Sequence, residues 1–112
     1  MKIEGEGKLL RIFIGEADRY EGKPLFQVIV NKARQEGLAG ATVIRGLMGF
    51  GAHSRMHTAK ILRLSEDLPI IIEIVDSEEK IRKFVQDING MIQEGLITLE
   101  KIEVITYRSP EQ

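Results

Sequence analysis

The middle of the chain combines basic side chains with glycines and lacks acids. Between Glu36 and Glu66 there is no Asp or Glu, although the chain has 17 acidic residues, 16 Lys and Arg residues and a net charge of −1. This acid-free segment holds Arg45, Arg55, Lys60, Arg63, His53, His57, Gly37, Gly40, Gly46, Gly49 and Gly51. Glycines let backbone N–H groups approach an anion, and basic side chains supply the opposite charge. We therefore predict that the segment binds a phosphate or a similar anion.

Established phosphate motifs do not describe the segment. Residues 46–51 have the outer spacing of a P-loop, but Ala52 and His53 occupy the positions of its Lys and its Ser or Thr. Ser54 stands where a dinucleotide fingerprint has its third glycine. No acid or nucleophile accompanies the histidines in sequence, so we predict that the protein is not an enzyme.

Three alternatives remain open beside anion binding: a metal-binding module, a nucleic-acid-binding domain and a purely structural oligomer with no small ligand. His53 and His57 are four residues apart, as in some metal sites, but Arg55 between them opposes a cation. A trimeric metal-binding or cation-tolerance module is thus an alternative, and we expect no metal requirement. An RNA-binding βαββαβ domain is less favoured, because its glycine-aromatic motif belongs on the third strand and a basic footprint is expected. We therefore expect no nucleic-acid partner.

Composition favours a cytoplasmic protein. The chain has no Cys, which suits a reducing compartment. Its longest purely apolar run, residues 70–72, is far shorter than the roughly 20 residues that span a bilayer. We expect one domain over residues 1–112, with no direct membrane insertion.

Hydrophobic periodicity predicts six main elements. Strands are expected over residues 8–15, 41–48, 68–75 and 99–107. One helix should begin at Pro24 and close at Gly37, and another should begin at a capping box of Asp76 and Glu79 and end near Gly95. This order is typical of an α+β, ferredoxin-like βαββαβ fold, in which a four-stranded antiparallel sheet carries both helices on one face. Because the strands are apolar on both sides, we expect another copy of the chain to cover the other face.

Several sequence segments resemble one known family. Residues 40–46 (GATVIRG), 49–54 (GFGAHS) and 68–75 (LPIIIEIV) resemble a bacterial and archaeal family described as PII-like, the domain of unknown function 190. The likeness extends over nearly the whole chain. Through this family the chain is similar to the PII nitrogen-regulatory signalling proteins. The resemblance implies a homotrimer that binds an adenine nucleotide (ADP, ATP or AMP) between subunits. It also implies a loop after the second strand that docks on a regulated transporter, channel or enzyme.

The resemblance also implies which residues form the site. A Gly-x-Thr-Val start and a Gly-Phe-Gly end of the second PII strand match residues 40–43 and 49–51. Residues 93–96 (QEGL) take the place of a glycine-rich, lysine-bearing nucleotide loop. The implied ligand-binding residues are Thr42, Arg45, Gly49, Phe50, Gly51, Ala52, His53, Arg55, Gly95 and Arg108. A ligand that binds the ordered loop better than the disordered one would shift its population and so regulate the partner.

Overall fold

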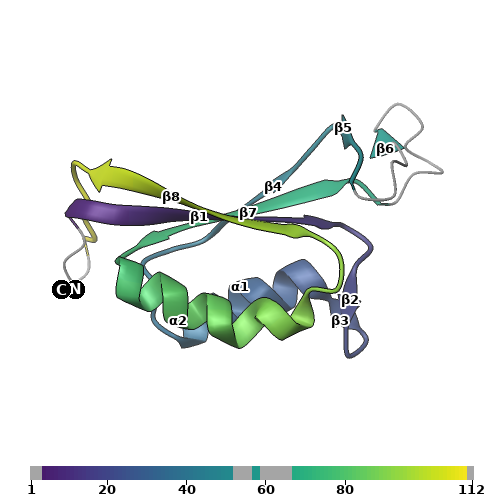
Figure 1. The fold of residues 1–112 in the computed structure, drawn as a ribbon, viewed down its shortest axis with the longest axis horizontal. Helices are drawn as coiled ribbons and strands as arrows, with labels where there is room; N and C mark the ends of the chain where they lie inside the picture. Colours follow the sequence, from purple (N-terminus) through teal and green to yellow (C-terminus); the bar gives the residue numbers. More distant parts are fainter. Residues whose placement is uncertain (1–3, 52–56, 59–66, 111–112) are drawn as a thin grey trace.

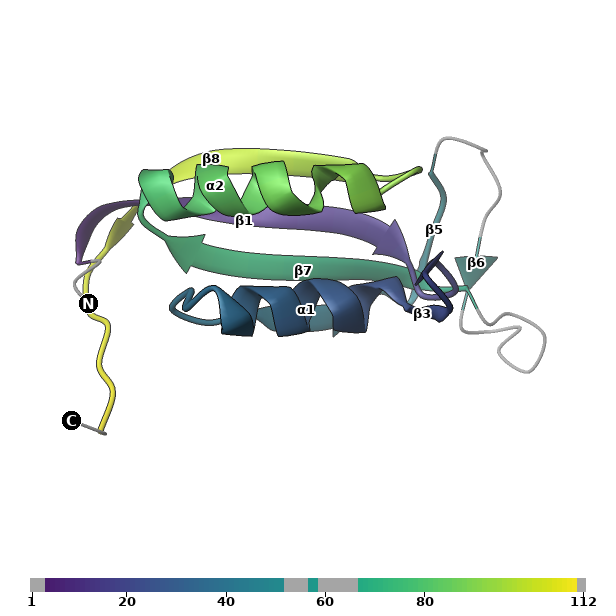
Figure 2. The ribbon, with the colours of Figure 1, turned by 90° about the horizontal axis from the view of Figure 1, so that it is seen from below.

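A central antiparallel sheet organises the protein. The computed structural model describes residues 4–51, 57–58 and 67–110. The elements are β1 (Gly5–Gly15), β2 (Arg19–Tyr20), β3 (Lys23–Pro24), α1 (Leu25–Gln35), β4 (Thr42–Arg45), β5 (Met48–Gly49), β6 (His57–Thr58), β7 (Pro69–Asp76), α2 (Glu78–Ile88), a 3₁₀ turn (Asn89–Met91) and β8 (Leu96–Val104). Four strands form the sheet in the order β4-β7-β1-β8, and every neighbouring pair is antiparallel. Both helices lie on the same face of this sheet (Figures 1 and 2). The predicted ferredoxin-like α+β fold is confirmed.

The core forms between the helices and the facing side of the sheet. Side chains alternate between the two faces of a strand, so every second residue is buried along β7 and along β1 from Leu10 to Ile14. Residues three or four positions apart on each helix complete the same cluster. The buried members are Leu10, Ile12, Ile14, Leu25, Ile29, Ala33, Ile70, Ile72, Ile74, Ile81, Phe84 and Ile88. The packed core fixes the strand register that builds the pocket described below.

The second helix begins differently from the prediction. Ser77, not Asp76, is its N-cap, because the Ser77 Oγ accepts the backbone N–H of Lys80 at 3.4 Å. The fully buried Asp76 carboxylate instead accepts the N–H of Ala39 at 2.9 Å and that of Ser77 at 2.7 Å. Asp76 thereby ties the α1–β4 connection to the start of α2. The helix also ends earlier than predicted, at Ile88.

The predicted ends of two strands, 41–48 and 99–107, were wrong because their partner strands end earlier, and the first and last strands start three residues before their predicted starts. β4 ends at Arg45, which pairs with Ile70, next to the first residue of β7. Met48 and Gly49 pair instead with β6 in a short hairpin. Likewise, Val104 pairs with Gly5, the first residue of β1, so β8 ends there instead of at residue 107. The chain then leaves the sheet, and the Tyr107 hydroxyl donates to the Ala39 carbonyl O at 2.7 Å.

The sheet face opposite the helices is apolar with a charged centre. In the middle strand, the Arg11 guanidinium donates to Glu73 of β7 at 2.9 Å and to Glu100 of β8 at 3.0 Å. Around this ion triad the face presents Leu9, Phe13, Ile44, Ile71, Val75 and Leu96. Neither helix covers this face (Figure 1). In the described part of the chain, neither helix has the length and apolar character needed to cross a bilayer.

Candidate functional site

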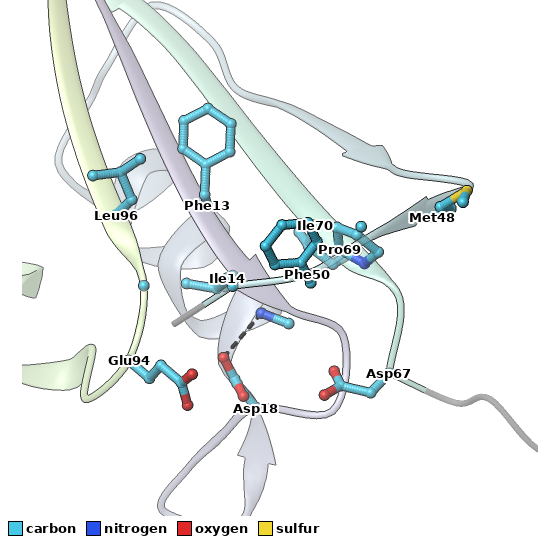
Figure 3. Close-up of a pocket in the computed structure, with 14 residues that line it drawn as sticks. Phe13, Ile14, Asp18, Met48, Phe50, Asp67, Pro69, Ile70, Glu94 and Leu96 are labelled. Carbon is cyan, nitrogen blue, oxygen red and sulfur yellow. Dashed lines mark hydrogen bonds between the residues drawn. The ribbon is translucent and has the colours of Figure 1, made fainter. Parts of the chain in front are cut away.

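A cavity of about 450 Å³ lies at one end of the sheet. It forms where β1 ends, where β7 and β8 begin, and where the β5 hairpin leaves the sheet (Figure 3). Antiparallel register brings these places together, since Gly15 pairs with Pro69 and Phe13 with Leu96. The volume is within the usual range for small-molecule sites.

The cavity has an apolar side and an acidic side. The apolar lining consists of Phe13, Ile14, Met48, Phe50, Pro69, Ile70 and Leu96. Asp18, Asp67 and Glu94 supply the carboxylates, which lie together below the aromatic rings in Figure 3. Phe50 is 67% exposed, so its ring can accept a ligand against it. Such a combination suits a flat, partly apolar molecule that carries hydrogen-bond donors.

Two glycines allow the walls of the cavity to approach each other. A Cβ at Gly95 would lie 2.6 Å from the backbone O of Phe13, closer than Cβ atoms come in proteins. A Cβ at Gly49 would lie 2.9 Å from Cγ of the Pro69 ring. The absence of a side chain at Gly95 therefore lets β8 approach β1. Its absence at Gly49 lets the β5 hairpin approach β7.

Two of the acidic groups hold the turn after β1. The Asp18 Oδ2 accepts the N–H of Gly15 at 2.9 Å, and the Asp67 Oδ1 accepts the N–H of Ala17 at 2.9 Å. The Glu16 N–H also donates to the Leu68 carbonyl O at 2.8 Å. These bonds fix the positions of the carboxylates relative to the floor of the cavity.

The structure brings together four residues of the predicted site. Gly49, Phe50, Gly51 and Gly95 all line the cavity, although more than 40 residues separate the first three from the last. Arg45 is not in the lining. Its Nη2 donates to Glu16 at 2.9 Å, and the pair is exposed to solvent.

Other predicted residues lie elsewhere. Thr42 lines a second cavity of about 580 Å³, between the outer sheet face and the chain after β8. Arg108 is exposed beyond Tyr107, at the end of β8 opposite the first cavity. Ala52, His53 and Arg55 lie outside the described residues, so their predicted roles stay predictions. Within residues 4–51, 57–58 and 67–110, no three metal-ligating side chains are grouped to hold a metal ion.

Sequence reasoning missed Asp18 and Asp67 on the acidic side of the cavity, whereas Glu94 lies in the segment 93–96 that takes the place of a nucleotide loop. Asp18, Asp67 and Glu94 come from three separate connections, those after β1, before β7 and before β8. Each of these residues lies a few positions before or after a strand of the central sheet. Once the antiparallel register is known, these positions must meet at one end of the sheet. The sequence alone indicates the approximate extent of the strands but not that register.

The sequence of the chain matches one protein family over most of its length. Residues 7–104 match the DUF190 family, described as "Uncharacterized ACR, COG1993". A UPF0166 protein from Aquifex aeolicus is 45% identical over 98 residues, which cover 88% of this chain and 92% of that protein. The chain belongs to the DUF190 family.

Solved structures of similar fold include a nucleotide-bound protein. CPII, a nitrogen regulatory PII-like protein from Thiomonas intermedia K12, was solved bound to ADP, AMP and bicarbonate. It is 19% identical, with a TM-score of 0.70 over 90% of each chain. The divalent ion tolerance protein CutA1 from Ehrlichia chaffeensis is 11% identical, with a TM-score of 0.55 over 93% of this chain and 86% of CutA1. At these identities the likeness concerns the fold alone.

Proposed function

We propose that the protein is a PII-like regulator that binds an adenine nucleotide in the cavity at the end of the sheet. The main support is the convergence of Gly49, Phe50, Gly51 and Gly95 around one ligand-sized cavity. The fold is that of CPII, whose structure contains ADP and AMP. We propose no catalytic role for the protein.

Signalling would pass through the segment after β4. β5 pairs with β6 and also supplies the wall of the cavity at Met48 and Gly49. A ligand against Phe50 would therefore contact the base of the segment between β5 and β7. If that ligand binds one arrangement of the segment better than another, it shifts the equilibrium between the two arrangements, and a transporter, channel or enzyme can distinguish them.

We also propose that the protein is cytoplasmic.

We propose that the working unit is a homotrimer joined through the outer sheet face. That face leaves Ile44 41% and Leu96 55% exposed beside the Arg11 ion triad, and contiguous apolar surface of this kind favours association. A neighbouring copy would also explain how Thr42 and Arg108, which are remote from the cavity in one chain, could take part in a nucleotide site between subunits.

Calorimetric titration with AMP, ADP and ATP tests nucleotide binding. Phe50→Ala removes an exposed ring that stacks on the base, and such stacking contributes about 1–3 kcal/mol, so affinity should fall at least about fivefold. Leu47→Ala is the matched control, because Leu47 is 79% exposed on the same segment and does not line the cavity. Absence of binding by all three nucleotides, or equal affinity of both variants and the wild type, would refute the proposal.

Sedimentation velocity tests the assembly. The wild type should sediment with three times the mass of one chain. Ile44→Lys places a charge on the outer sheet face and should yield smaller species, whereas Gln86→Lys, at an exposed position of α2 on the helix side of the sheet, should not. A monomeric wild type would contradict the trimer.

The cation-tolerance alternative has its own test. Zinc or copper titration of the wild type and of the His53→Ala, His57→Ala double variant distinguishes the two functions. If the wild type binds the metal tightly and the double variant does not, the metal-binding function is favoured.

A further inference from the structure

We propose that the ion triad of Arg11, Glu73 and Glu100 decides whether a second copy of the chain can cover the outer sheet face. This inference rests on the proposed homotrimer and names the residue that controls its assembly. Arg11 is that residue, because it compensates carboxylates that a neighbouring copy would remove from water. The triad governs association and adds little to the stability of one chain.

The sheet register assembles the triad in the middle of the outer face. Arg11 of β1 pairs with Glu73 of β7. Glu100 of β8 pairs with Leu9, two residues before Arg11. Residues that are opposite each other or offset by two positions lie on one face, within reach of long side chains. The Arg11 Nε donates to Glu73 Oε2 at 2.9 Å, and its Nη1 donates to Glu100 Oε1 at 3.0 Å. One guanidinium therefore joins three neighbouring strands.

The triad is exposed to solvent in a single chain. The side chains of Arg11, Glu73 and Glu100 are 38%, 32% and 60% exposed. Ion pairs with this much exposure contribute little to folding. Replacing Arg11 should therefore leave the chain folded, so its effect on association can be measured separately.

Covering the outer face makes Arg11 essential. Apolar residues occupy this face two positions before and after both Arg11 and Glu73, namely Leu9, Phe13, Ile71 and Val75. A copy that packs on these side chains also displaces water from the triad. Burying a charge is strongly unfavourable unless it is paired. Without Arg11, the contact would bury carboxylates that have no counter-charge in the triad.

The charge of the face fits a second copy. One guanidinium faces two carboxylates, so the triad carries an excess negative charge, and the surface that covers it should bring a cation toward Glu100. β8 is an edge strand of the four-stranded sheet, and the chain has exposed cations in this strand and shortly after it, Lys101 and Arg108. The edge of one copy can therefore supply the charge that the face of another requires. This complementarity favours a second copy over an unrelated partner.

The triad should restrict association without strengthening it. Replacing a buried ion triad by apolar residues of similar volume is often neutral or stabilising, whereas removing one partner alone is strongly destabilising. Loss of Arg11 alone should therefore weaken trimer formation, and loss of all three charges together should restore it. A mere loss of side-chain contacts at Arg11 predicts no such recovery.

Sedimentation velocity over a range of protein concentrations tests the inference. Arg11→Met should raise the concentration needed for assembly at least about tenfold. The triple variant Arg11→Met, Glu73→Leu, Glu100→Leu should assemble at concentrations no higher than the wild type requires. Arg82→Met is the matched control, because Arg82 forms an ion pair with Glu78 at 2.8 Å on α2, which lies on the other side of the sheet (Figure 1). Its loss should leave assembly unchanged.

The outcomes separate this inference from the proposed function. If Arg11→Met assembles like the wild type, or if the triple variant fails to regain assembly, the role of the triad is refuted while the homotrimer stands. An Arg11→Met chain that far-UV circular dichroism shows to be unfolded would also contradict the inference, since the exposed triad should add little to folding. If the wild type is monomeric, the proposed homotrimer fails and the inference fails with it.

Discussion

Replacing Gly95 by alanine should push the start of β8 away from β1. The added Cβ would lie 2.6 Å from the Phe13 carbonyl O, 3.1 Å from Ile92 Cγ2 and 3.2 Å from Ile14 Cγ2. The closest of these is a backbone atom of a central strand, so it cannot move aside by changing a rotamer. Overpacking of this kind costs about 1–3 kcal/mol of unfolding free energy. The same displacement would distort the cavity wall and weaken nucleotide binding.

Gly90→Ala is the matched control for this substitution. Nothing lies within 4 Å of a Cβ at Gly90, which is in the 3₁₀ turn after α2. Alanine there should be neutral or stabilising by up to about 1 kcal/mol. Urea unfolding followed by circular dichroism should therefore separate the two variants by about 1–4 kcal/mol. Equal unfolding free energies would refute the close approach of β8 and β1 that builds the cavity.

Three further substitutions test the surrounding structure. Asp76→Ala removes a buried acceptor of two half-buried backbone N–H groups and should lower the unfolding free energy by about 2–5 kcal/mol in urea titration; a loss below about 1 kcal/mol would contradict its role. Tyr107→Phe loses the bond to the Ala39 carbonyl O and should cost about 0.5–1.5 kcal/mol, and an unchanged midpoint would argue against that contact. Burial, reinforced by a hydrogen bond with Asp87, raises the pKa of Glu36, so its stabilising contribution is present in acid and is lost as the pH rises through the raised pKa. The stability of the wild type relative to Glu36→Gln should therefore fall as the pH rises above the ordinary glutamate pKa of about 4.3, and a rise would refute the assignment.

Hydrophobic periodicity predicted the main elements because their burial is regular. In β1 and β7 alternate residues are buried, and in both helices residues three or four apart face the core. The boundaries that failed depend on partners that the sequence does not reveal. β8 starts at Leu96 because Phe13 is available to pair with it, and β4 stops at Arg45 because β7 starts at Pro69.

The candidate site was only partly predictable for the same reason. The glycines and Phe50 stood out through a local pattern after the second strand, and Gly95 through the resemblance to PII proteins. The carboxylates of Asp18 and Asp67 belong to no local pattern. They meet Glu94, which lies in the segment 93–96 that the resemblance singled out, only through the sheet register. Local charge in the sequence indicated an anion site, and this stays a prediction because Arg55, Lys60 and Arg63 lie outside the described residues.

Backbone amide chemical shifts measured during AMP titration test the central claim most directly. The account predicts saturable shifts at Gly49, Phe50, Gly51 and Gly95, with Gly90 unaffected. Saturable shifts that spare these four cavity residues, or no shifts at all, would contradict a nucleotide site at this end of the sheet.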